Sequence, residues 1–140
     1  MFSQLLKYHR KGSFALKPEH LLSNVCNAPA DASGVYLAFA LDKGTKTLIY
    51  IGRSGKEIEG KIKHRHGGIK DRLVNGKQFG DRRAKSWPRQ MKIDAIEHLQ
   101  VDWFVTHSEQ WLDCPTKLEK QLLNEFEQLN GHLPAWNKSK

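Results

Sequence analysis

Residues 34–52 read GVYLAFALDKGTKTLIYIG, and most of the fold prediction follows from them. Two apolar runs, 34–41 and 47–52, flank a short polar segment around Gly44. Runs rich in β-branched and aromatic residues, joined by turn-forming residues, are typical of an antiparallel hairpin. The runs carry Tyr36 and Tyr50, and a buried tyrosine hydroxyl needs a hydrogen-bond partner. The hairpin therefore indicates a polar site built on a sheet, the alternative being two core tyrosines with their hydroxyls at the rim.

A shared site requires both phenols on one face of this hairpin. Pairing Asp42 with Leu48 across a five-residue loop places Tyr36 and Tyr50 on the same face, because side chains alternate along a strand. A register shifted by one residue would place them on opposite faces. We therefore expect the Asp42 to Leu48 pairing.

The rest of the chain predicts helices, one further strand and a long loop. A loop rich in glycine and charge at about 54–68 breaks the periodic pattern and is interpreted as an insertion. Gly131, followed by Pro134, marks the end of the last helix. Mixed elements of this kind predict an α+β fold, with helices packed on the faces of a small, mostly antiparallel sheet. The helices are expected at about 17–27, 69–76, 88–99 and 116–130, and the further strand at about 99–106.

Positive charge is concentrated in one third of the chain. The net charge is +8, and residues 53–92 hold 13 Lys/Arg against 4 Asp/Glu, which leaves the remainder at −1. This distribution is the footprint expected of a phosphate-backbone partner, although a solvated basic face is the alternative. The candidate phosphate-binding or DNA-binding residues are Arg53, His64, Arg65, His66, Lys70, Arg82, Arg83 and Lys85.

Length and composition predict one cytoplasmic domain. A chain of 140 residues can bury a core without disulfides or metals. Cys26 and Cys114 lie far apart and lack metal-ligand spacing, so reduced thiols are favoured while a disulfide stays open. The N-terminus lacks a signal-peptide pattern, and no apolar run approaches the length of a membrane span. We expect no membrane partner, and homodimer formation is left open.

Glu119 is the acidic residue with the clearest functional signal. On a helix that starts near Thr116, Glu119 falls inside an apolar arc of roughly 140°. A carboxylate on such an arc is costly unless it is paired, capped or bound to metal. The segment Thr116-Lys117-Leu118-Glu119 also fits a capping box, which would give Glu119 a structural role instead.

The segments Gly34-Val35-Tyr36 and Tyr50-Ile51-Gly52 resemble the paired signature of the GIY-YIG endonucleases, with valine replacing the usual isoleucine. The resemblance covers roughly residues 34–138. It implies a three-stranded, three-helix nuclease core within a domain at 34–140, with the basic loop at about 54–68 inserted into it. Residues 1–33 have no counterpart and are expected to form an N-terminal helical extension.

The resemblance also implies a catalytic set: Tyr36, Tyr50, Arg72, Glu119 and Asn137. Glu119 would be the metal ligand and hold one Mg²⁺ or Mn²⁺ ion, while Arg72 would bind the scissile phosphate. One of the two phenols would take the proton from the attacking water, and the sequence leaves open which one. Asn137 would organise the site through an inward-pointing amide.

Three positions depart from the family pattern or extend it. Arg72 lies further behind the second signature than the family places its arginine, so Arg65 is the alternative. Some relatives carry a histidine one helical turn after that arginine, where this chain has Gly76. Arg53 stands where relatives often carry lysine and could assist at the phosphate.

These observations predict a metal-dependent endonuclease that hydrolyses DNA, double-stranded rather than single-stranded. The alternative is a basic nucleic-acid-binding module on the same fold without catalysis. A small chain with an insertion beside the site is more typical of restriction-type or mobile-element nucleases than of a repair protein's incision module.

Overall fold

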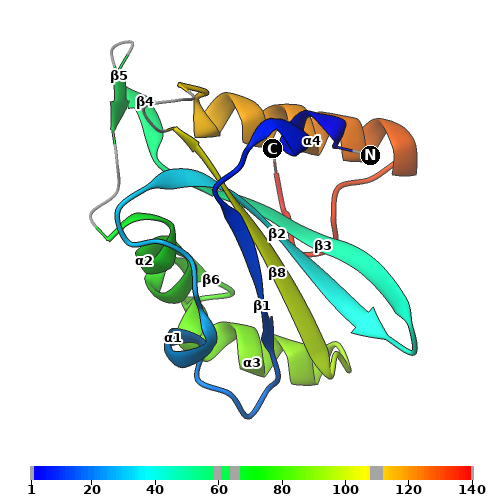
Figure 1. The fold of residues 1–140 in the computed structure, drawn as a ribbon. Helices are drawn as coiled ribbons and strands as arrows, with labels where there is room; N and C mark the ends of the chain where they lie inside the picture. Colours follow the sequence, from blue (N-terminus) through cyan, green and yellow to red (C-terminus); the bar gives the residue numbers. More distant parts are fainter. Residues whose placement is uncertain (1, 59–60, 64–66, 108–111, 140) are drawn as a thin grey trace.

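The chain folds around a four-stranded antiparallel sheet with helices on both faces (Figure 1). The structure, a computed structural model, describes residues 2–58, 61–63, 67–107 and 112–139. The predicted α+β class is confirmed, whereas the expected three-stranded sheet is wrong because the N-terminal region adds a strand. The strand order is β1-β8-β2-β3, with β1 at Lys11–Leu16, β2 at Ser33–Asp42, β3 at Thr45–Ser54 and β8 at His98–His107.

The N-terminal region is part of the sheet rather than a helical extension. β1 pairs with β8 along its whole length, and its alternating residues Phe14 and Leu16 are buried. Only two core residues mark this strand, which is too few for its period of two to stand out in the sequence. The helix expected at about 17–27 is limited to α1 (Leu22–Val25), and Ser3–Lys7 forms a 3₁₀ helix, η1.

The β2–β3 hairpin turns more tightly than predicted. Asp42 pairs with Thr45, not with Leu48, so Lys43 and Gly44 alone form the turn. Their φ angles are 48° and 83°. Positive φ at both central residues is the type I′ geometry, whose twist matches that of the flanking strands.

A β-bulge then changes the register inside the hairpin. Tyr36 pairs with Gly52 and Ala38 with Tyr50, but the pairing is shifted by one residue from there to the turn. Ile49 is the extra residue on β3. If Ile49 were instead paired in a regular ladder, Tyr50 would lie opposite Leu37, and Tyr36 and Tyr50 would be on opposite faces of the sheet.

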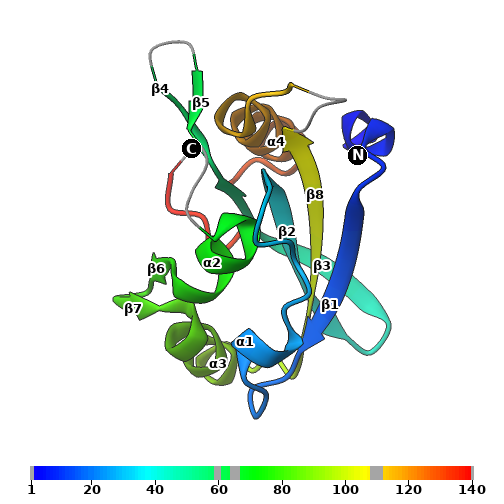
Figure 2. The ribbon, with the colours of Figure 1, turned by 60° about the vertical axis from the view of Figure 1, so that its left-hand side comes forward.

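Helices α1 to α3 cover one face of the sheet, and α4 with η1 covers part of the other (Figures 1 and 2). The first core contains Trp87, Met91 and Val101, among other side chains. The second joins Leu37 of β2 to Leu122 of α4. The helices are α2 at Gly68–Asn75, α3 at Arg83–Ile93 and α4 at Pro115–Asn130.

The predicted elements differ most from the observed ones between β3 and α3. Part of the expected loop at about 54–68 forms a hairpin of β4 (Lys56–Ile58) and β5 (Lys61–Lys63), which projects away from the sheet (Figure 2). A smaller hairpin of β6 (Lys77–Gln78) and β7 (Asp81–Arg82) leads into α3. Pro88 lies inside α3, so the helix start predicted at Pro88 is wrong.

β8 and α4 lie within one residue of their predicted bounds, and Gly131 ends α4 with a φ of 78°. None of the helices in the described part of the chain has the length and apolar character needed to span a bilayer.

Candidate active site

Four of the five predicted catalytic residues line one pocket at the open edge of β3. The pocket has a volume of about 400 Å³. Tyr50 comes from the edge strand itself, Arg72 from α2, Glu119 from α4 and Asn137 from the C-terminal segment. Helices from both faces of the sheet therefore meet around this edge.

Tyr36, the fifth predicted residue, lies against Gly52 on the neighbouring strand. Its side chain is fully buried, and its ring centroid is 6.1 Å from that of Tyr50. A Cβ atom on Gly52 would lie only 2.5 Å from the Tyr36 ring, so this position has no room for a larger residue. The expectation that both phenols share a face is confirmed, although the register predicted for it is wrong.

The Tyr36 hydroxyl is enclosed and has no hydrogen-bond partner among the described residues. Burial raises the pKa of Tyr36 to about 12, against the opposing effect of the positive charges on Arg83 and Arg72. An unpartnered buried hydroxyl costs about 1–3 kcal/mol. Such groups call for a specific explanation, and a catalytic role is a common one.

Glu119 lies among three arginines yet remains poorly solvated. Its side chain is 18% exposed, and its Oε1 atom is 3.7 Å from Nε of Arg53. Burial raises the pKa of Glu119 above its ordinary value, while the charges of Arg53, Arg72 and Arg83 oppose this effect. A carboxyl group with a raised pKa in a pocket is a marker of functional sites.

The capping-box interpretation of Glu119 is wrong. Helix α4 begins at Pro115 with Cys114 at the N-cap, and no side chain caps its N-terminus. A capping box requires Thr116 at the N-cap, but Thr116 lies inside the first turn. The Thr116 hydroxyl instead accepts a hydrogen bond from Nε of Arg53 at 3.1 Å. Glu119 therefore has no capping role.

Arg83, a predicted phosphate-binding residue, lines the pocket but is buried. Its side chain is 1% exposed. Its Nε donates to Oε1 of Gln78 at 2.9 Å, its Nη1 to the Arg72 carbonyl at 2.8 Å and its Nη2 to the Tyr50 hydroxyl at 2.9 Å. Arg83 thus belongs to the interior of the site.

A sequence signal for this burial exists but depends on the bounds of α3. Arg83, Trp87 and Met91 are spaced by four residues and share the buried face of the helix. Because the helix was expected to begin at Pro88, this stripe was not visible. Gln78, whose Oε1 also accepts from Nε1 of Trp87, carries no sequence signal at all.

Asn137 fastens the C-terminal segment to the edge of β3. Its Oδ1 accepts from the Ile51 amide, and its Nδ2 donates to the Ile51 carbonyl, both at 2.9 Å. The Trp136 amide donates to the Ile49 carbonyl at 2.8 Å. These bonds satisfy strand groups that an open edge would expose. The Asn137 amide thus shapes the pocket wall through the backbone of β3.

The remaining phosphate-binding candidates have different positions. Arg53 and Lys70 are half-buried, and Arg82 and Lys85 are exposed. The pocket is also lined by two exposed lysines that were not predicted, Lys77 and Lys138. The candidates His64, Arg65 and His66 lie outside the described residues.

Glu119 is the one acidic side chain that lines the pocket within the described ranges. In that part of the chain no three His, Cys, Asp or Glu side chains gather into a metal-binding group. A protein cage for a metal is therefore not formed there. One carboxylate, completed by water and substrate phosphate, is nevertheless a usual way to bind Mg²⁺.

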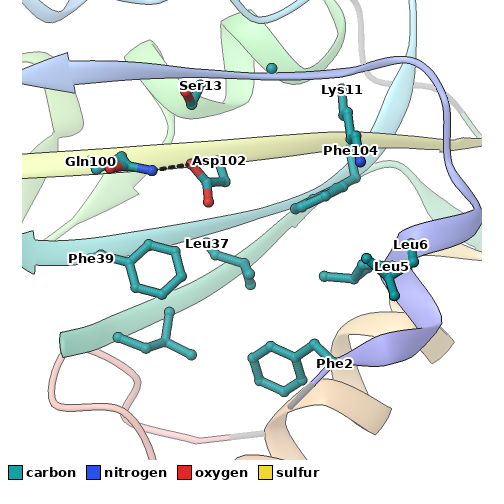
Figure 3. Close-up of a pocket in the computed structure, with 12 residues that line it drawn as sticks. Phe2, Leu5, Leu6, Lys11, Ser13, Leu37, Phe39, Gln100, Asp102 and Phe104 are labelled. Carbon is teal, nitrogen blue, oxygen red and sulfur yellow. Dashed lines mark hydrogen bonds between the residues drawn. The ribbon is translucent and has the colours of Figure 1, made fainter. Parts of the chain in front are cut away.

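A larger hollow of about 670 Å³ lies on the face of the sheet that η1 and α4 partly cover (Figure 3). Its lining is mostly apolar and includes Phe2, Leu37 and Phe39, with Lys11 and Asp102 as its charged members. This hollow contains no predicted site residue. Its lining does not suit a phosphate, for which positive charge is required.

Comparison of the chain with known proteins found no significant match to a family model, a curated protein or a solved structure. The resemblance to GIY-YIG endonucleases therefore depends on the quoted motifs. Function has to be inferred from the chemistry of the pocket itself.

Proposed function

We propose that this chain is a metal-dependent endonuclease of the GIY-YIG type that hydrolyses DNA. One observation carries the proposal: a desolvated carboxyl group, an arginine and two phenols, distant in sequence, converge on the edge of β3. These residues are Glu119, Arg72, Tyr50 and Tyr36. Phosphodiester hydrolysis needs positive charge to bind the phosphate, a carboxylate to bind a metal cation and a group such as a phenol to transfer a proton.

Each residue has a role that its chemistry supports. Arg72 binds the scissile phosphate through two parallel hydrogen bonds, a geometry that lysine does not reproduce. Glu119 holds a single Mg²⁺ or Mn²⁺ ion, which neutralises charge on the phosphate oxygens when bound. Arg53 supports Glu119 and Thr116 at the start of α4. A phenol of the Tyr36 and Tyr50 pair accepts a proton from the attacking water.

The arrangement of elements supports the same family-type core. Strands β2, β3 and β8, with helices α2, α3 and α4, make a three-stranded, three-helix unit, to which β1 and α1 are additions. The pairing of Tyr36 with Gly52 joins the two signature segments directly. Exposed Lys77, Arg82, Lys85 and Lys138 supply positive charge for a DNA backbone.

Cleavage assays with and without metal test this proposal. Purified protein is incubated with supercoiled plasmid, single-stranded DNA or RNA, in Mg²⁺, Mn²⁺ or EDTA. We expect plasmid cleavage with either metal and none with EDTA. Glu119→Gln should lower the rate on the order of 10³-fold while DNA binding persists, because the amide lacks the charge that a hard cation requires.

Asp113→Asn is the matched control, because Asp113 also lies near the start of α4 but does not line the pocket. Its cleavage rate should equal that of the wild type. Full metal-dependent turnover by Glu119→Gln would exclude Glu119 as the ligand. Binding without cleavage by the wild type, in every metal, would favour the non-catalytic nucleic-acid-binding module.

A further inference from the structure

Arg83 is a buried cation that has no anionic partner among the residues that the structure describes. Its three hydrogen bonds go to neutral oxygens, those of Gln78, the Arg72 carbonyl and Tyr50. No carboxylate lies within ion-pair distance of it in the described part of the chain. An unpaired buried charge is strongly unfavourable, so its retention calls for a reason beyond stability.

The surroundings of Arg83 hold its guanidinium in one place. Its Cζ lies 5.9 Å from the ring centroid of Tyr36, 5.3 Å from that of Tyr50 and 5.7 Å from that of Trp87. These aromatic faces partly compensate the charge. A Cβ atom on Gly76 would lie 2.2 Å from Nη1, so the glycine leaves the space that the guanidinium fills.

Hydrogen-bond chemistry then distinguishes the two phenols. A guanidinium has only donors, so the Tyr50 oxygen must be the acceptor in its bond with Arg83. A hydrogen bond from a cation stabilises negative charge on the accepting oxygen. Tyr50 lines the pocket, whereas the Tyr36 hydroxyl is enclosed and has no partner among the described residues.

We propose that Arg83 is a positioning residue that makes Tyr50 the proton acceptor of the hydrolysis, while Tyr36 stays neutral beside it. This inference rests on the proposed nuclease function. Tyr50 first releases its own proton to solvent, and Arg83 compensates the resulting charge. The attacking water then gives one proton to the Tyr50 oxygen. The oxygen of that water forms a bond to phosphorus as the bond from phosphorus to the leaving oxygen breaks. The leaving oxygen takes a proton from solvent.

Other charged groups line the same pocket as Tyr50. Arg72 of α2, Lys77 of β6 and Lys138 of the C-terminal segment add positive charge to the same pocket, and Glu119 of α4 adds negative charge. Arg83 is distinguished from them by its direct hydrogen bond to the phenol.

Site-resolved NMR tests the link between Arg83 and Tyr50 without any cleavage. The chain has three tyrosines, so labelling at Cζ gives signals that Tyr-to-Phe variants assign. Arg83→Gln should move the Cζ chemical shift of Tyr50, because the hydrogen bond to its oxygen is lost, and Arg83→Lys should move it less. No movement at Tyr50, or a movement confined to Tyr36, would overturn the inference.

Kinetics with phenylalanine variants test the role of Tyr50 even if Arg83 variants fold poorly. Tyr50→Phe should lower kcat on the order of 10²-fold or more with little change in KM, because a proton acceptor is lost rather than a binding contact. Tyr36→Phe should lower kcat less, and Tyr8→Phe, remote from the pocket, should keep the wild-type rate. A larger loss in Tyr36→Phe than in Tyr50→Phe overturns the assignment alone, whereas absence of cleavage by the wild type overturns the proposed function.

Discussion

Two clusters in the molecule each combine a phenol, a carboxyl group and a cation, but their hydrogen bonding differs. They are the N-terminal cluster of Lys7, Tyr8 and Asp113 and the edge pocket around Glu119. In the N-terminal cluster, the Tyr8 hydroxyl donates to Oδ2 of Asp113 at 2.6 Å. Nζ of Lys7 lies 2.7 Å from the same oxygen. In the edge pocket, the Glu119 carboxylate has its nearest cation at 3.7 Å and the Tyr36 hydroxyl is unpartnered within the described residues.

The two carboxyl groups differ accordingly in the direction of their pKa shifts. Hydrogen bonds from Lys7 and Tyr8 lower the pKa of Asp113. Burial raises the pKa of Glu119 despite the arginines around it. A phenol, a carboxylate and a cation thus stabilise the fold where their hydrogen bonds and ion pairs are all formed. Where the bonds are incomplete, they leave groups available for a ligand.

The largest expected difference between the clusters is in the role of the cation. Arg72→Lys should lower kcat/KM on the order of 10²- to 10³-fold, because the charge stays but the bidentate geometry is lost. Lys7→Arg, which also retains its charge, should leave kcat/KM unchanged. Single-turnover plasmid cleavage measures both. Equal activity in the two variants would show that the bidentate hydrogen bonds of Arg72 do not contribute to catalysis.

A smaller effect is expected from the exposed cations near the edge pocket. Replacing Arg82 and Lys85 together by glutamine should weaken DNA binding by about tenfold and reduce the slope of log K against log salt. Arg83 is left out of this variant because it is buried. Fluorescence anisotropy across a salt series measures the slope.

The matched control removes two lysines from the side of the sheet that carries the N-terminal cluster, in the variant Lys11→Gln with Lys46→Gln. Lys11 lines the apolar hollow, and Nζ of Lys46 lies over the Phe39 ring in the same hollow. Its salt slope should match that of the wild type. Identical slopes in both double variants would contradict a DNA surface beside the edge pocket.

The smallest expected effect is on stability, and its sign should differ between the two carboxyl groups. The lowered pKa of Asp113 means that its contribution is present above its ordinary pKa and is lost as the pH falls through the lowered value. Asp113→Asn should therefore destabilise the protein at neutral pH, by about 1 kcal/mol or less because the side chain is 38% exposed.

The raised pKa of Glu119 has the opposite consequence. Ionisation costs the folded state stability as the pH rises from the ordinary pKa through the raised value. Glu119→Gln should therefore keep or raise the thermal midpoint at neutral pH, with no such gain at low pH. Thermal unfolding between about pH 3 and pH 8 measures both variants. A midpoint lowered at neutral pH by Glu119→Gln would mean that its arginine contacts outweigh desolvation.

Local patterns in the sequence predicted the elements that long, regular segments encode. The β2–β3 hairpin is marked by two apolar runs around a turn, β8 and α4 have clear periodicity, and Gly131 ends α4 as expected. β1 was missed because it has few core residues and takes its stability from pairing with β8. Short strands of this kind depend on partners that are distant in sequence.

The same distinction applies to the candidate site. Motifs predicted that Tyr50, Arg72 and Glu119 would share a site, and they line one pocket. The burial of Arg83 depends on Gly76 and on acceptors from three other segments, which no local pattern reports. Which tyrosine serves as proton acceptor follows from that contact and stays a prediction.

The bulge at Ile49 lies between the turn and Tyr50, and it decides whether Tyr50 shares a face of the sheet with Tyr36. Asp42 pairs with Thr45, so a regular ladder through every residue of β3 would pair Tyr50 with Leu37 and place it on the face opposite to Tyr36, while leaving every side chain chemically intact. A chain with the same tight turn and no residue at the Ile49 position would keep both phenols on one face through a regular ladder, so its alignment with this chain needs a gap at the bulge and not in the turn.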